Sequence, residues 1–246
     1  MIKAVIFDID NTLYDYDNAH ATAMKALYQY TNAHFGWSEE ETSAALKTEY
    51  SQFQDEIGKR AAIHNRLIRF QRILEKKGLP LHPHALNMYN TYWDTLIAYA
   101  TVFPNVKETL GELRDKGLIL GVGTNMTSHV QFRKLTAFGL LEYFSFIVSS
   151  EEADYEKPQK DIFLKCAAKA HCDPSQCVYV GDSLIHDIVG AQNAGMPALW
   201  FRPVKVNPFP SNSLPVDYVD PGTQKSESAV SFHDFSELPQ LISSIK

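Results

Sequence analysis

The stretch VIFDIDNT, which runs from Val5 to Thr12, limits what this chain can fold into more than any other part of its sequence. It starts as an apolar run and ends in two aspartates one residue apart, Asp8 and Asp10. Such a run predicts a buried strand, which ends at a sheet edge and brings both carboxylates to one place. Neighbouring carboxylates repel each other unless a cation or a reaction uses them. One carboxylate can attack phosphorus while the other transfers a proton; the alternative is a solvated turn.

The size and composition of the chain exclude several classes of protein. With 246 residues, of which 45% are hydrophobic, it can form one large domain or one domain with an insertion. A net charge of -6 argues against a nucleic-acid polymer as partner. Three cysteines fit neither a common zinc spacing nor a disulfide framework, which predicts a reducing compartment. No signal peptide or membrane-length apolar run is visible, so we expect a cytoplasmic protein without membrane contact.

Residues 16–100 have the pattern of a helical bundle. Ser38 followed by Glu41 has the spacing of a capping box and predicts a helix start. Gly78 with Pro80 predicts a helix end. Few other glycines or prolines interrupt the segment, and about four helices fit between them. We therefore predict a small helical domain inserted after the first strand.

The remainder of the chain alternates strands and helices. Short apolar runs occupy residues 118–123, 144–148, 178–180 and 198–201, and helical patterns lie between them at 106–114 and 160–170. Strands that are apolar throughout predict a parallel sheet covered on both faces. The predicted fold is an α/β, Rossmann-like core of residues 1–15 and 101–246 with the bundle of residues 16–100 inserted. Beyond Arg202 we predict a Pro- and Ser-rich loop and a short closing helix at 236–245.

Polar residues follow the predicted strands, where parallel α/β sheets collect their chemistry. Thr124 and Asn125 follow the second strand and could hold a phosphoryl oxygen, or Thr124 could cap the next helix. Lys157 precedes a proline that restricts its backbone, and could neutralise phosphate charge or lie on the surface. Asp182 ends a later strand, with Asp187 about one helical turn beyond it. Carboxylates of this kind suit Mg²⁺, although Asp182 could also cap a helix.

Together, these motifs resemble those of the haloacid dehalogenase superfamily. The matching motifs are Asp8-x-Asp10-x-Thr12, Thr124-Asn125, Lys157-Pro158 and Gly181-Asp182-x4-Asp187. The chain is most similar to the phosphatases of that superfamily that carry a helical cap after the first strand, and the resemblance covers essentially its whole length. Asn11 stands where many members have glycine, a small departure because asparagine tolerates unusual backbone angles.

This resemblance implies a phosphatase that hydrolyses a small phosphomonoester metabolite. Asp8 would attack phosphorus to form an aspartyl-phosphate, while Asp10 would protonate the leaving oxygen and later deprotonate water. Mg²⁺ would be bound by Asp8, the main-chain carbonyl of Asp10, Asp182 and Asp187.

The resemblance also implies roles for groups around the phosphate. Thr124, Asn125 and Lys157 would hold the phosphoryl oxygens. The cap would close over the site and select the substrate. Its candidate specificity residues are Tyr16, His20, Arg60, His64 and Asn65. On their helices, His20 and His64 could equally be surface or packing residues.

Other functions stay open at this point. A phosphomutase would share the first steps and transfer the phosphoryl group to a second substrate hydroxyl. A carbon–halogen hydrolase of the superfamily usually lacks the second aspartate, so Asp10 argues against it. A phosphonate-cleaving relative would need a cap lysine, for which Lys25, Lys47 and Lys59 are candidates. A non-catalytic binding module would normally lack part of the motif set, which is complete here.

Overall fold

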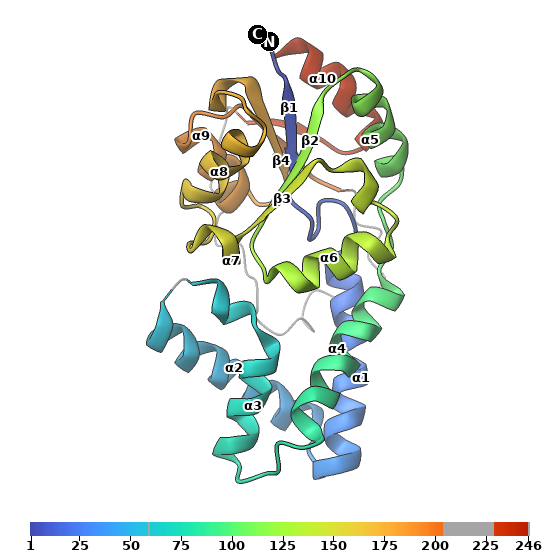
Figure 1. Ribbon diagram of the computed structural model, residues 1–246. Coiled ribbons are helices and arrows are strands. Elements are labelled where there is room, and N and C mark those ends of the chain that lie inside the picture. Colours follow the sequence, from blue (N-terminus) through green and yellow to red (C-terminus); the bar gives the residue numbers. More distant parts are fainter. Residues whose placement is uncertain (59, 204–228, 246) are drawn as a thin grey trace. The chain divides into compact units, whose positions relative to one another are not determined.

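The computed structural model describes residues 1–58, 60–203 and 229–245 (Figure 1). Within these residues, contacts divide the chain into two compact units. The first contains Met1–Asp15 and the described residues from Val102 onward, and the second contains Tyr16–Thr101. None of the helices in the described ranges has the length and hydrophobicity that a membrane span requires.

The first unit is built on a six-stranded sheet in which every neighbouring pair is parallel, with strand order β3-β2-β1-β4-β5-β6. This sheet confirms the predicted Rossmann-like α/β fold. The strands are β1 (Ala4–Phe7), β2 (Ile119–Thr124), β3 (Phe146–Ser149), β4 (Cys177–Gly181), β5 (Ala198–Phe201) and β6 (Val230–Phe232).

The sequence prediction missed the last of these strands. β6 has three residues, and Val230 and Ser231 are exposed, so no apolar run marks it. It pairs with β5 at the edge of the sheet. Most of the loop predicted beyond Arg202 lies outside the described residues. The closing helix is present as a 3-10 turn, η5 (Phe235–Glu237), followed by α10 (Leu238–Ser244).

Helices cover both faces of the sheet, which explains why the central strand β1 is apolar and buried at every position. The main α-helices of this unit are α5 (Val106–Asp115), α6 (Ser128–Ala137) and α8 (Asp161–Lys169), with short α7 (Ser150–Ala153) and α9 (Gly190–Asn193). Figure 1 shows α8 and α9 on one side of the strands and α5 and α10 on the other. In β1, Ile6 joins the core beneath α8, whereas Phe7 stacks on Phe235 with ring centroids 6.3 Å apart. Successive side chains of a strand point to opposite faces, so both must be apolar.

The second unit is the helical bundle that the sequence predicts. It consists of α1 (Tyr16–Phe35), α2 (Glu39–Ile57), α3 (Arg66–Lys76) and α4 (His84–Tyr99), with a 3-10 turn, η1 (Ala61–His64). The predicted capping box starts α2: Ser38 Oγ accepts from the N–H of Glu41 at 3.2 Å, and a Glu41 carboxylate oxygen accepts from the N–H of Ser38 at 2.7 Å. Residues from all four helices form the bundle core, among them Leu27 of α1, Phe53 of α2, Phe70 of α3 and Leu96 of α4, all buried.

Candidate functional site

The parallel register of β1, β2 and β4 brings the motif residues to one edge of the sheet. Phe7 lies opposite Val122 of β2 and Val180 of β4, so the residues that follow each strand emerge together. The N–H of Asp8 continues the ladder by donating to the Val180 carbonyl at 2.9 Å. Asp8 is therefore fixed at the carboxyl end of the central strand, where the sequence predicts it.

Lys157 binds two of the predicted acidic residues at this edge. Its ammonium lies 2.7 Å from Asp8 Oδ1 and 2.6 Å from Asp187 Oδ1, and it donates to the Tyr179 hydroxyl at 2.9 Å. The Lys157 residue is 4% exposed, which rules out the surface position considered for it. Tyr179 was missed by sequence reasoning because it lies within the apolar run of β4.

Three carboxylates form a cluster, and two of them bind this ammonium. Ligand oxygens of Asp8, Asp182 and Asp187 all lie within 4.8 Å of one another. Asp182 Oδ1 accepts from the Thr12 hydroxyl at 3.2 Å, and Asp187 Oδ2 accepts from the N–H of Ser183 at 2.9 Å. These contacts orient the carboxylates from outside the cluster.

Two local features of the chain allow the cluster to form. A Cβ at Gly181 would overlap the Asp187 side chain, so glycine is needed for the close approach. The π-helical turn η4 (Leu184–Val189) is capped by Ser183, whose Oγ accepts from the N–H of His186 at 3.2 Å. Ser183, and not Asp182, is therefore the helix cap, which leaves the Asp182 carboxylate to the cluster.

Burial and mutual repulsion shift the pKa values of the groups in the cluster. Burial raises the pKa of Asp8 from its ordinary 3.8 to about 6; the charges of Asp187 and Asp10 add to the rise and Lys157 opposes it. Burial, with Asp187 and Asp8, also raises the pKa of Asp182 well above its ordinary value. For Lys157, burial alone lowers the pKa, but Asp187 and Asp8 outweigh it and raise the pKa. One ammonium therefore does not balance three carboxylates.

The donor set fits a hard divalent cation. Three carboxylates supply the oxygen ligands that Mg²⁺ prefers, and their mutual repulsion gives a cation a direct electrostatic role. Within the described part of the chain, no other group of three acidic, histidine or cysteine side chains meets this spacing.

The carboxylate of Asp10 lies outside the acidic cluster and has different partners. Its Oδ1 accepts from the ammonium of Lys134 at 2.6 Å and from the Tyr14 hydroxyl at 2.6 Å. Sequence reasoning missed both residues. Between the two aspartates and this tyrosine, Asn11 has a φ of 59°, the left-handed conformation that asparagine tolerates.

Thr124 is the last residue of β2, Asn125 follows it, and both contact neighbouring groups of the site. Asn125 binds the main chain of Lys157 in both directions: its Oδ1 accepts from the N–H at 2.8 Å and its Nδ2 donates to the carbonyl at 3.4 Å. The Thr124 hydroxyl accepts from Gln131 Nε2 at 2.9 Å. Thr127 precedes the first residue of α6, so Thr124 is not the helix cap considered as an alternative.

The predicted specificity residues all lie in the helical unit, and two of them share one cluster. The rings of Tyr16 and His20 stack with centroids 5.4 Å apart. The Tyr92 hydroxyl lies 3.3 Å from the Tyr16 hydroxyl and 2.7 Å from His20 Nδ1. The guanidinium of Arg66 lies over the Tyr92 ring at 4.0 Å. His20 is buried in this cluster, as the packing alternative expects.

The other three candidates lie around the 3-10 turn. Arg60 is exposed and precedes η1, and His64 ends it. Asn65 caps α3, because its Oδ1 accepts from the N–H groups of Leu67 and Ile68 at 3.1 and 3.3 Å. The described contacts therefore give Asn65 a structural role.

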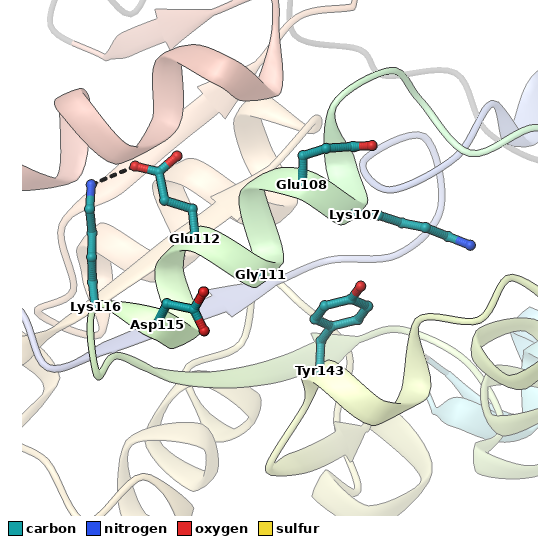
Figure 2. Close-up of a pocket in the computed structure, with 7 residues that line it drawn as sticks. All are labelled: Lys107, Glu108, Gly111, Glu112, Asp115, Lys116 and Tyr143. Carbon is teal, nitrogen blue, oxygen red and sulfur yellow. Dashed lines mark ion pairs between the residues drawn. The ribbon is translucent and has the colours of Figure 1, made fainter.

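A surface hollow of the first unit lies elsewhere. Figure 2 shows the residues that line it beside α5, with an ion pair between Glu112 and Lys116. The volume of the hollow is about 620 Å³, and the ion pair has a length of 2.7 Å. The hollow is lined by Lys107, Glu108, Gly111, Glu112, Asp115, Lys116 and Tyr143. None of these belongs to the motifs, and both members of the ion pair are about half exposed, so the hollow lacks the buried, convergent charges of the Asp8 site.

Comparison with known proteins points to one family. Residues 5–201 match the family model described as haloacid dehalogenase-like hydrolase. The chain is 33% identical to the ribulose-1,5-bisphosphate 5-phosphatase of Halopiger xanaduensis, over 82% of this chain and 86% of that one. It is 34% identical to the glyceraldehyde 3-phosphate phosphatase of Methanopyrus kandleri, over 82% and 84% of the two chains. Among solved structures, the 2-haloacid dehalogenase of Pseudomonas syringae pv. Tomato matches with a TM-score of 0.74 and 28% identity, over 99% of both chains.

Proposed function

The chain belongs to the haloacid dehalogenase-like hydrolase family, and we propose that it is a Mg²⁺-dependent phosphatase of a small phosphorylated metabolite. One observation carries this proposal: the site has two aspartates, each with its own cationic partner. Asp8 is buried in an acidic cluster and binds Lys157, and Asp10 binds Lys134. The two relatives above are named for small phosphorylated substrates. We propose the same substrate class for this chain.

In the proposed mechanism, Asp8 is the nucleophile. Lys157 binds its Oδ1, while Oδ2 accepts no hydrogen bond from the described residues and can attack phosphorus. A bond forms between Oδ2 and phosphorus, and the bond from phosphorus to the leaving oxygen breaks. Asp10 gives its proton to that oxygen. In the second step water attacks phosphorus, Asp10 takes the proton, and phosphate leaves Asp8 as a free carboxylate.

The remaining groups of the site balance charge. Asp8, Asp182, Asp187 and the main-chain carbonyl of Asp10 would hold Mg²⁺, which when bound neutralises negative charge between nucleophile and substrate. Lys157 supplies a fixed positive charge beside the phosphoryl group, and Asn125 holds the main chain of Lys157 in place. The Thr124 hydroxyl, whose oxygen already accepts from Gln131, has its hydrogen available to a phosphoryl oxygen.

A carbon–halogen hydrolase is the rival that the comparisons raise, since a 2-haloacid dehalogenase has the same fold at 28% identity. A halide leaves as a stable anion and needs no proton, so that reaction gives Asp10 no role in the first step. Here Asp10 is held by two donors at 2.6 Å. The presence of an oriented second carboxylate favours phosphate ester cleavage.

Phosphate release from a panel of phosphorylated metabolites tests the proposal. The panel is run with Mg²⁺ and with a chelator, beside Asp8→Asn as the nucleophile variant and Asp115→Asn as a surface control on α5. We expect Mg²⁺-dependent release from a few related compounds, unchanged in the control and absent in Asp8→Asn. Halide release from 2-haloacids without phosphate release would contradict the proposal, and isomerised sugar phosphate without free phosphate would indicate a phosphomutase.

A further inference from the structure

Lys134 is a fully buried lysine that none of the family motifs includes. It lies in the last turn of α6 with no exposed surface. Lysine is almost never fully buried unless it is paired, because removing an ammonium from water is costly. Its ammonium lies 2.6 Å from Asp10 Oδ1. The fold thus places a desolvated cation directly on the proposed proton-transfer group.

Tyr14 contacts the same oxygen from the opposite end of the loop that carries Asp10. Its hydroxyl donates to Asp10 Oδ1 at 2.6 Å, and the residue is fully buried. The ring packs on Phe138 with centroids 4.8 Å apart, and the Lys134 ammonium lies 5.6 Å from the centre of the Tyr14 ring. Packing therefore restrains both donors, and they hold Oδ1 together.

The two oxygens of Asp10 consequently have different environments. Oδ1 accepts two short hydrogen bonds, whereas Oδ2 accepts none from the described residues. The Asp10 side chain is 23% exposed, so it is only partly enclosed. Oδ2 is the oxygen that can exchange a proton with a substrate or with water.

We propose that Lys134 and Tyr14 are positioning residues that hold Asp10 Oδ1, so that Oδ2 alone carries the proton in both steps. This inference rests on the proposed phosphatase function. When Asp10 is protonated on Oδ2, Oδ1 still accepts from both donors, because it needs only its lone pairs. As the leaving oxygen departs from phosphorus, the Oδ2 proton moves to it. When water attacks the phosphorylated Asp8, its proton moves to the same Oδ2, and the carboxyl group need not rotate between steps.

The variants Lys134→Met and Tyr14→Phe test this arrangement. Lys134→Met keeps an apolar stem of similar length, and Tyr14→Phe removes only a hydroxyl. The matched controls are Lys169→Met, which removes an ion pair with Glu152 on the surface, and Tyr143→Phe in the hollow of Figure 2. Circular dichroism and the melting temperature establish that each variant is folded.

The substrates are chosen for their need of a proton on the leaving oxygen. The first is the alkyl phosphate that the wild type turns over fastest, whose alkoxide must be protonated. The second is p-nitrophenyl phosphate, whose leaving group departs without a proton. For the alkyl phosphate, we expect kcat of Lys134→Met to fall at least about tenfold with KM changed by less than about threefold, since general acid catalysis contributes about 10²–10⁴-fold. Tyr14→Phe should lose about threefold to tenfold.

For p-nitrophenyl phosphate we expect a pre-steady-state burst in Lys134→Met. Transfer to Asp8 stays fast without the acid, while hydrolysis, which needs Asp10 as base, becomes slow. About one p-nitrophenolate per active site should therefore appear before slow turnover begins. A merely structural role would instead lower the folded fraction of the protein. The burst and the steady-state rate would then fall in equal proportion, and they would do so with both substrates.

Two results would overturn the positioning role. One is an equal loss of turnover rate on both substrates without a burst, and the other is a rate in both variants equal to that of the controls. If Lys134→Met does not fold, the substrate dependence of Tyr14→Phe decides the question. Failure of the proposed function gives a different result, because the wild type would then release no phosphate from any phosphomonoester.

Discussion

At the scale of single residues, Asp8 is subject to two opposing requirements. In the proposed mechanism it must be ionised to attack phosphorus, yet its carboxylate is buried and lies within 4.8 Å of two further carboxylates. Burial raises its pKa to about 6, so folding disfavours its charged form. Lys157 offsets part of this cost through an ion pair of 2.7 Å. The burial of Asp8, the proposed nucleophile, therefore lowers the stability of the protein when no metal is bound.

We expect Asp8→Asn to stabilise the protein in chelator. The folded-state pKa of Asp8 is raised from 3.8 to about 6, so its unfavourable contribution is absent below about pH 4, grows as pH rises to 6, and is complete above it. At pH 8 the free energy of unfolding should increase by at most about 3 kcal/mol. For a chain of this size, each kcal/mol raises the melting temperature by roughly 2–4 °C.

Thermal melts of wild type, Asp8→Asn and Asp115→Asn at pH 5 and pH 8 measure this effect. The increase in melting temperature for Asp8→Asn should be larger at pH 8 than at pH 5, and Asp115→Asn should show neither change. A lower melting temperature for Asp8→Asn at pH 8 would mean that its ion pair with Lys157 outweighs the cost of burial.

Sequence alone located the residues that belong to a contiguous motif and missed those that reach the site through tertiary structure. Asp8 and Asp182 follow apolar runs, and the fold delivers both to one edge. From the sequence, Lys134 is indistinguishable from an ordinary basic residue in the last turn of a helix, where cations are favoured. The one available signal was its place on the buried face of α6, between Val130 and Leu135.

At the scale of elements, the end of β4 and the turn after it form the acidic half of the site. Gly181 ends the strand, Ser183 caps η4, and Asp187 returns toward the strand end within that turn. α6 supports the other half, because Gln131 and Lys134, one turn apart, contact Thr124 and Asp10. Thr124 and Asp10 are thus each contacted by a side chain of α6, an element other than their own.

Gly181→Ala should displace Asp187 without unfolding the sheet. Its Cβ would overlap the Asp187 carboxyl group, so we expect Mg²⁺ affinity to fall about 10–100-fold, as for other changes that misorient a ligand. Melting temperature as a function of Mg²⁺ concentration reports this affinity, since a ligand specific for the native state stabilises it.

Gly111→Ala is the matched control for that substitution. It lies in the interior of α5, where the nearest atom to an added Cβ belongs to Tyr143 at 3.9 Å. Alanine is favoured there by about 0.5–1 kcal/mol, so the melting temperature should rise slightly and the Mg²⁺ response should be unchanged. A wild-type Mg²⁺ response in Gly181→Ala would show that Asp187 is not needed to bind the ion.

Most elements could be predicted because each has a strong local pattern. β5 coincides with its predicted run at 198–201, and Ser38 starts α2 as its capping box indicates. β6 could not be predicted, since a three-residue edge strand with two exposed positions has no periodicity to detect. Ser183 was overlooked because aspartate and serine are both good caps and adjacent residues compete for that position.

At the scale of the whole molecule, one site is assembled from segments far apart in the chain. β1 from the N-terminus lies between β2 and β4, so Asp8 meets Lys157 across a separation of 149 residues. The alternating pattern predicts a parallel sheet and the edge where chemistry collects. The order of its strands depends on how the helices pack on both faces. A local sequence pattern does not specify this packing. We infer that this assembly makes Asp8 the reactive residue.

Detection of phosphate on Asp8 during turnover tests that claim most directly. The wild type is mixed with Mg²⁺ and its best phosphomonoester, quenched in acid within milliseconds, and mapped by peptide mass spectrometry. We expect a phosphorylated Asp8 that forms and decays at rates compatible with turnover. In Asp8→Asn we expect neither this phosphopeptide nor release of phosphate. Turnover by the wild type with Asp8 unmodified at every time, or phosphate release by Asp8→Asn at the wild-type rate, would contradict it.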